Sequence, residues 1–104
     1  MASGLKQFTY TVTASAVRLT TAMGVTPGSD GDLVAKQILF QGRTANTGLV
    51  FIGDATVSAT DYGFAVDKGV TTISLGPVQL GLRLQEIYII GTASDKLQIT
   101  ILPN

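Results

Sequence analysis

Residues 5–13 read Leu-Lys-Gln-Phe-Thr-Tyr-Thr-Val-Thr, and this alternation decides the fold class. Phe8, Tyr10 and Val12 fall on one side of an extended chain, while the glutamine and the threonines between them fall on the other side. A period of two residues is typical of a half-buried β-strand. The segment therefore predicts a strand with aromatic side chains in a core and threonines in solvent.

The rest of the chain has the same layout of short strands. The chain contains 31 β-branched residues, nine Val, eight Ile and fourteen Thr, and this class of residue favours sheets over helices. Twelve glycines are spread along the chain, and they predict turns between these strands. Residues 84–90 are apolar on both faces, so we expect them to lie centrally between layers. The remaining strands are predicted at residues 17–19, 34–41, 49–52, 56–59, 64–66, 71–75 and 97–102.

These segments predict an all-β fold of eight or nine short strands without a helix. Each half-apolar sheet needs a second layer to cover it, so the expected architecture is an antiparallel two-sheet β-sandwich, with a jelly roll as one possible connectivity. A closed barrel is the alternative. With 104 residues and a mass of 10.8 kDa, the chain is expected to form one domain over residues 1–104.

Composition excludes several chemistries. The sequence contains no Cys, His or Trp, which excludes thiol nucleophiles, histidine triads and zinc sites built from Cys or His. Seven basic residues balance seven acidic ones, which argues against binding to nucleic acid or an anionic membrane through a basic patch. Charged residues make up only 13% of the chain, against about 25% in ordinary globular proteins. No catalytic residue, cofactor or metal is predicted.

No stretch reaches the roughly 18 apolar residues that could span a bilayer, and the N-terminus lacks the apolar core of a signal peptide. We therefore expect a soluble protein made in a cytoplasm.

The most loop-like segment is residues 26–32, Thr-Pro-Gly-Ser-Asp-Gly-Asp. Asp30-Gly31-Asp32 has the only spacing that suggests a calcium loop, but the further acidic ligands of such a loop are missing. Gly24, Gly28 and Gly31 lack the spacing and the lysine of a phosphate-binding loop. We expect an ordinary turn with solvated carboxylates.

The other acidic residues also predict structure rather than catalysis. Glu86, the only glutamate, is expected at the rim of a sheet; if it were buried it would need Arg83 or Arg18 as a partner. The remaining carboxylates lie in predicted turns, where Asp is favoured because its side chain bonds to nearby backbone groups: Asp54, Asp61, Asp67 and Asp95.

The aromatic side chains are expected to pack in the core. A stacking platform for nucleic-acid bases normally lies in a positively charged groove, which a neutral chain does not favour. Tyr62, in a predicted turn, is the one aromatic residue expected to be exposed. The other six are Phe8, Tyr10, Phe40, Phe51, Phe64 and Tyr88.

Two phrases of sequence resemble segments of a known group of proteins. The first is residues 46–53, Asn-Thr-Gly-Leu-Val-Phe-Ile-Gly, followed by Val57-Ser58 and by Asp-Lys-Gly-Val-Thr at 67–71. The second is residues 84–90 followed by Gly-Thr-Ala-Ser-Asp-Lys at 91–96. Together they cover roughly residues 44–102 and are similar to phrases in small β-rich virion proteins of tailed bacteriophages.

This resemblance implies a non-enzymatic structural protein of a bacteriophage virion, assembled in the host cytoplasm. The expected role is capsid decoration (cement), in which a homo-oligomer binds and stabilises the capsid shell; its partners would be itself and capsid or other virion proteins. The single compact domain favours decoration over a neck, tail or fibre component. The low charge fits, because interface centres are depleted in charged residues.

Two other classes stay open. A module that binds carbohydrate on a host surface would carry exposed aromatics in a row on one sheet face, and burial of Phe8, Tyr10 and Tyr88 would count against it. An enzyme of the glycosidase type would need two carboxylates facing each other in a pocket.

Overall fold

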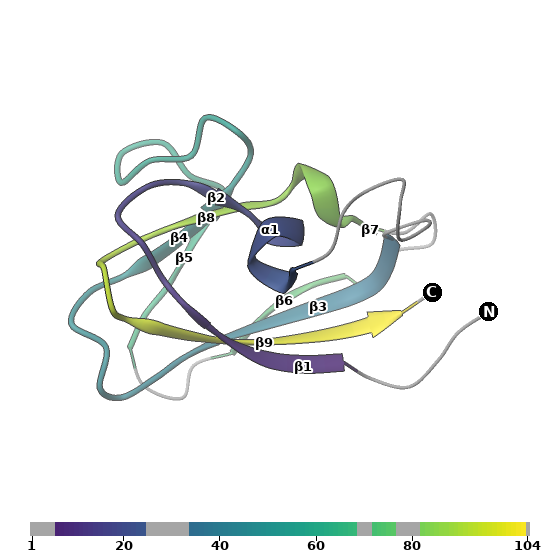
Figure 1. The fold of residues 1–104 in the computed structure, drawn as a ribbon, viewed down its shortest axis with the longest axis horizontal. Helices are drawn as coiled ribbons and strands as arrows, with labels where there is room; N and C mark the ends of the chain where they lie inside the picture. The colour runs from purple at the N-terminus through teal and green to yellow at the C-terminus, as the bar shows by residue number, and fades with distance from the viewer. Residues whose placement is uncertain (1–5, 25–33, 69–71, 77–81, 104) are drawn as a thin grey trace.

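The computed structural model describes residues 6–24, 34–68, 72–76 and 82–103, which form two antiparallel sheets (Figure 1). The opening alternating segment lies at one edge of the five-stranded sheet. In order across that sheet the strands are β1 (Lys6–Thr11), β9 (Lys96–Pro103), β3 (Val34–Gly42) and β6 (Thr72–Leu75), with β7 (Leu82–Arg83) paired to the start of β3.

The four-stranded sheet forms the second layer. Its strands, in order, are β2 (Val17–Arg18), β8 (Tyr88–Ile90), β4 (Val50–Gly53) and β5 (Phe64–Val66). The chain alternates between the two sheets from β1 to β4 and returns from β8 to β9. This is the connectivity of a jelly roll, with β7 as an additional short strand.

The period-two pattern builds the core between the sheets. In the five-stranded sheet, Ile99 lies between Phe8 on β1 and Phe40 on β3, and Leu97 lies beside Tyr10. Ile52 and Ile89 pair on the facing side of the other sheet. Ile52, Ile89, Leu97, Ile99 and Phe40 are almost completely buried, and Phe8 and Tyr10 pack against them. Burial of this apolar area is the main stabilising contribution.

The prediction of an antiparallel two-sheet β-sandwich is confirmed, and the described residues contain nine strands. The expected strands at 5–13, 34–41, 49–52, 64–66, 71–75 and 97–102 correspond to β1, β3, β4, β5, β6 and β9, shifted at their ends by one to two residues within the described part. The loop at 26–32, with Asp30, Asp32, Gly28 and Gly31, lies outside the described residues.

The expectation that the fold has no helix is wrong. The segment predicted as a strand at 17–19 contains the short β2, and the chain then turns into α1 (Leu19–Met23), which ends at Gly24 with a left-handed φ of 76°. Leu19, Ala22 and Met23 have the i, i+3, i+4 spacing of an amphipathic helix. Leu19 is completely buried, so packing of this face on the core favours the helix.

Two strand predictions fail for different reasons. Residues 84–90 do not form one central strand: they contain the 3₁₀ turn η1 (Leu84–Glu86) and β8, because the chain crosses here from β7 in one sheet to β8 in the other. Only the β8 part is central, between β2 and β4. Residues 56–59 form a turn rather than a strand, in which Val57 alone is buried.

No helix in the described part of the chain has the length and apolar character that crossing a bilayer requires.

Gly42, at the end of β3, is required by a close approach of backbone. A Cβ atom at this position would overlap the carbonyl oxygen of Asp67, a backbone atom that cannot turn away. We expect Gly42→Ala to lower the free energy of unfolding by about 1–3 kcal/mol, the usual cost of overpacking. Gly48→Ala is the matched control, because its Cβ would meet only the Thr92 hydroxyl. Urea denaturation of both variants measures the difference, and equal losses would contradict this account.

Candidate functional site

The two phrases of sequence meet at a buried carboxylate. Asp95, only 4% exposed, accepts hydrogen bonds from the backbone N–H groups of Thr47 (2.9 Å) and Gly48 (3.1 Å) and from the Thr47 hydroxyl (3.1 Å). Both carboxylate oxygens are used, Oδ1 by Thr47 and Oδ2 by Gly48. A buried charge is tolerated only with such partners, so the loop 43–49 and the turn 91–95 depend on each other.

Asn46 strengthens the same junction. Its side-chain amide donates to the carbonyl of Lys96 (2.8 Å), and its side-chain oxygen accepts the Lys96 N–H (2.8 Å). The amide therefore satisfies both backbone groups of the first residue of β9, as a neighbouring strand would. We call Asn46, Thr47, Gly48, Asp95 and Lys96 the Asp95 junction.

The end of β1 joins this junction through backbone alone. Val12 donates its N–H to the carbonyl of Asp95 (2.8 Å) and accepts the N–H of Ser94 (3.1 Å). Gly91 donates to the carbonyl of Thr13 (3.1 Å). Ser94 has a left-handed φ of 77°, an uncommon conformation that this turn enforces. Three connections between the sheets, 12–16, 43–49 and 91–95, are thus held together.

The pKa of Asp95 is lowered from its ordinary value of 3.8 by this environment. Burial is the largest single influence and acts to raise the pKa, but it is outweighed by the hydrogen bonds from the Thr47 and Gly48 backbone and the Thr47 hydroxyl. The junction therefore holds a carboxylate in its charged form. The Asp95 carboxylate therefore stabilises the fold, and its lowered pKa does not suit it to donate a proton near neutral pH.

Of the other predicted turn carboxylates, Asp54 and Asp67 bond to nearby backbone N–H groups through their side chains, as expected, whereas Asp61 takes part in its turn through its backbone. Asp54 accepts the N–H (2.9 Å) and hydroxyl (2.6 Å) of Thr56, and the Thr56 hydroxyl and then its backbone lower the pKa of Asp54. Asp67 accepts the N–H of Lys68. Asp61 closes a turn in which its carbonyl accepts the N–H of Ser58 (2.7 Å). In the described part of the chain no three acidic residues gather as a metal site would require.

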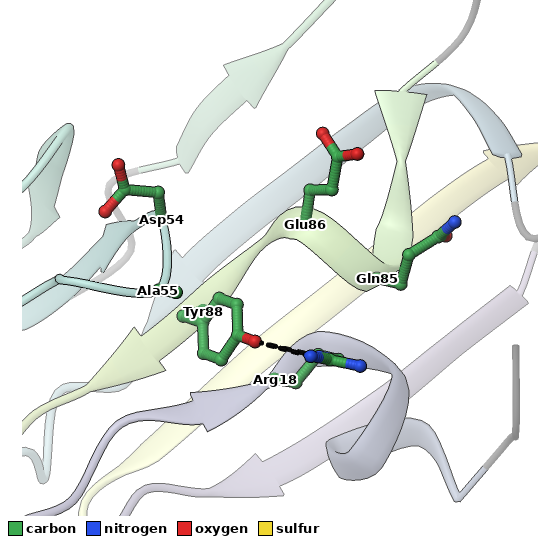
Figure 2. Close-up of a pocket in the computed structure, with 6 residues that line it drawn as sticks. All are labelled: Arg18, Asp54, Ala55, Gln85, Glu86 and Tyr88. Carbon is green, nitrogen blue, oxygen red and sulfur yellow. Dashed lines mark hydrogen bonds between the residues drawn. The ribbon is translucent and has the colours of Figure 1, made fainter.

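Glu86 lies exposed at the rim of the four-stranded sheet, as expected, and forms a 3.6 Å ion pair with Arg83. It also lines a depression of about 350 Å³ (Figure 2). Beside it, the Tyr88 hydroxyl accepts hydrogen bonds from Nε (2.9 Å) and Nη2 (2.7 Å) of Arg18. The guanidinium carbon lies 5.4 Å from the centre of the Tyr88 ring, so Arg18 also makes a cation–π contact.

Asp54 lines this depression opposite Glu86, so the structure does place two carboxylates around one hollow (Figure 2). A glycosidase acid needs a raised pKa, whereas the pKa of Asp54 is lowered. Both carboxylates are exposed to solvent. Asp54 therefore lacks the raised pKa that the acid of such a pair requires.

A second depression, of about 220 Å³, is lined by Gly53, Asp54, Asp61, Tyr62 and Gly63. Tyr62 is 46% exposed, as its turn position predicts, and its ring packs against Phe51 with centroids 4.7 Å apart. We call residues 53–63 the carboxylate loop. Backbone hydrogen bonds order this loop. The Val57 N–H donates to the carbonyl of Asp54 (3.0 Å), and the Gly63 N–H donates to the carbonyl of Ile52, the residue just before the loop (2.8 Å).

The outer side of the five-stranded sheet is mostly polar. Rows of paired residues cross it, for example Thr9, Gln98, Gln41 and Thr72. We call this surface, opposite the core side of β1, β9, β3 and β6, the threonine–glutamine face. Its members are Gln7, Thr9, Thr11, Gln37, Leu39, Gln41, Thr72, Ser74, Lys96, Gln98, Thr100 and Leu102.

Side-chain hydrogen bonds order this face. Arg43 donates to the Thr9 hydroxyl (3.0 Å) and to Oε1 of Gln98 (3.0 Å), and Thr9 itself donates to Gln98 (2.9 Å). Lys96 donates through Nζ to Thr11 (2.8 Å). The pairing of β3 with β9 shifts between Ala35 and Gln37. At this bulge Lys36 is exposed.

The aromatic residues do not form an exposed row. Phe8, Tyr10 and Phe64 are half-buried against the core, and Phe40 is buried. Phe51 and Tyr88 lie on the outer side of the four-stranded sheet, so the expectation that they pack in the core is wrong; there Tyr62 packs against Phe51, and Arg18 donates to the Tyr88 hydroxyl. This arrangement gives little support to a carbohydrate-binding platform.

No family model matches the chain, and no curated protein matches it. A solved structure described as "Bacillus endospore appendages form a novel family of disulfide-linked pili" is similar to it with a TM-score of 0.50 and 16% sequence identity. The similarity covers 97% of this chain and 87% of the other. At this identity the likeness shows a shared fold.

We expect Asp95→Ala to lower the free energy of unfolding by about 2–3 kcal/mol at neutral pH, because the N–H groups of Thr47 and Gly48 lose a charged acceptor inside the protein. Asp54→Ala is the matched control, since Asp54 makes similar bonds at an exposed position, and its loss should be much smaller. Chemical denaturation measures both, and equal effects would refute a special role for the Asp95 junction.

The lowered pKa of Asp95 also predicts a pH dependence. The stabilisation is fully present above the ordinary value of 3.8 and is lost as the pH falls through the lower pKa of the folded protein. The difference in unfolding free energy between wild type and Asp95→Ala should therefore be constant near neutrality and shrink below about pH 4. Asp54 is present in both proteins, so its own contribution of the same sign cancels.

Proposed function

We propose that this chain is a non-enzymatic structural subunit that packs against other proteins in a repetitive assembly, with capsid decoration of a bacteriophage virion as the setting that its sequence resemblance favours. The observation that carries the proposal is the threonine–glutamine face. It spans four strands, and its side chains are ordered by hydrogen bonds before any partner arrives.

The physical character of this face suits protein contact. Ordered side chains lose less conformational freedom on binding than free ones. The central residues Leu39, Thr100 and Gln41 are uncharged and partly buried already. Interface centres are depleted in charge in the same way, since a charge that loses water without a partner costs free energy.

The solved pilus structure supports the same class of function in a different setting. Its printed description names an appendage linked by disulfides, whereas this chain contains no cysteine. A filament built from this chain would therefore be held by non-covalent contacts alone. An appendage filament is the second candidate, and it makes the same use of the threonine–glutamine face.

Mass spectrometry of purified virions or surface filaments from the source of the chain separates the two settings. The proposal expects the chain at many copies per particle or per filament, and cryo-electron microscopy should locate it at regular intervals. Finding the chain in neither fraction would remove the support for a structural subunit.

The threonine–glutamine face can be tested by one substitution. Thr100→Arg places a long charged side chain at its centre, beside Leu39 and Gln7, without entering the core. We expect incorporation into the assembly to fall at least about tenfold with the unfolding midpoint little changed. Thr21→Arg, on the exposed side of α1, is the control and should incorporate normally. Normal incorporation of Thr100→Arg would exclude this face as the contact.

A further inference from the structure

Among the described residues, the outer side of the five-stranded sheet and the carboxylate loop carry opposite charge, although the chain as a whole is neutral. In the five-stranded sheet, the described residues of β1, β3, β6, β7 and β9 include no carboxylate. Three exposed cations, Lys36, Arg43 and Lys96, lie on or at the border of the threonine–glutamine face. That face is therefore basic.

The carboxylate loop, which extends from the other sheet, is acidic. Asp54, Asp61 and Glu86 line the two depressions there. Two cations lie near them: Arg18, which donates to the Tyr88 hydroxyl, and Arg83, which forms the 3.6 Å ion pair with Glu86, so the excess of carboxylates is confined to the carboxylate loop with Asp54 and Asp61. Asp67 and Lys68 lie next to Gly42 and carry one charge of each sign, so together they do not change the charge of either surface. In Figure 1 the carboxylate loop lies at the top of the view, above β4, while β1 and β9 cross the bottom.

The depression in the carboxylate loop has the chemistry of a receptor for a cation. It is bordered by the Asp54 and Asp61 carboxylates and by the exposed Tyr62 ring. Carboxylates bind guanidinium and ammonium groups through charge-assisted hydrogen bonds, and a tyrosine ring adds a cation–π contact. The loop is held by its own hydrogen bonds and by buried Val57, so it need not be ordered by a ligand.

We infer that the threonine–glutamine face of one copy docks onto the carboxylate loop of a second copy, with Arg43 or Lys96 of the first copy entering the Asp54–Asp61 depression of the second. The inference rests on the proposed function and names the partner of that same surface. Charge complementarity selects a second copy because both matching surfaces are present on every chain.

The size of the contact surface limits the affinity of a single contact. Four strands at about 4.8 Å spacing span roughly 15 Å, and five residues along a strand span about 17 Å. The area of the threonine–glutamine face is therefore on the order of 300 Å², well below the roughly 800 Å² that each partner buries in a stable complex. A single contact is therefore weak and salt-sensitive, and repetition supplies the strength.

Two different surfaces meet in this contact, so the arrangement is head to tail. The two surfaces belong to different sheets, so one partner does not engage both at once, and the contact closes into a ring or continues as an open filament.

Charge reversal tests the inference by sedimentation equilibrium of the full chain at low salt. Wild type should self-associate, and added salt should weaken the association. Lys96→Glu and Asp61→Lys should each weaken it at least about tenfold, because an ion pair becomes a like-charge pair. The double variant Lys96→Glu with Asp61→Lys should recover association. Lys6→Glu, which changes the net charge equally but faces the core side of β1, is the control and should behave as wild type.

The outcomes separate this inference from the proposed function. A wild type that stays monomeric at high concentration overturns the inference, and incorporation of that monomer into virions would leave the proposed function standing with a different protein as the occupant. Self-association that ignores Asp61→Lys also overturns it. Failure of both self-association and incorporation would overturn both proposals.

A cross-linking measurement gives the same answer without changing any charge. Because the chain contains no cysteine, single thiols can be introduced as Thr100→Cys, at the centre of the threonine–glutamine face, and Ala59→Cys, exposed in the carboxylate loop. A short bis-maleimide should join the two variants when they are mixed, several-fold more than it joins either alone. Equal cross-linking of Thr100→Cys with itself would show a face-to-face dimer and contradict the inference.

Discussion

The structure depends on the buried carboxylate of Asp95. Three of the chain's crossings between the two sheets, at 12–16, 43–49 and 91–95, meet at this residue through its side chain or its backbone. Asn46 completes the junction by pairing with both backbone groups of Lys96. A two-sheet fold is defined by how its crossings are placed, so one polar cluster at this end aligns both layers.

This alignment has a consequence for the surface. With the strands held in register, every second residue of β1, β9 and β3 points outward, and these positions hold threonine, glutamine and a few cations. The opposite side receives the carboxylate loop and the Arg18–Tyr88 pair. Among the described residues, the chain thus has cations at the threonine–glutamine face and carboxylates in the carboxylate loop while its composition stays neutral, and these give the molecule two unlike surfaces for contact.

The alternation of apolar and polar residues predicted the half-buried strands. It did not predict the segments whose structure depends on tertiary packing. β1, β3 and β9 follow from a period of two residues. The apolar run at 84–90 reads equally well as one strand, and only the covering layers make it cross from one sheet to the other at η1. α1 is five residues long, too short to form without the core that buries Leu19.

The sequence by itself determined the fold class, the absence of histidine and cysteine chemistry, and the turn positions of Asp54 and Asp61, because these follow from residue type and short-range periodicity. Tertiary structure alone decided that Asp95 is a buried anchor for Thr47, 48 residues away along the chain. It alone also brought Lys36, Arg43 and Lys96 to one side of the five-stranded sheet. Both results depend on which residues distant in sequence become neighbours, and strand order across the sheets sets those distances.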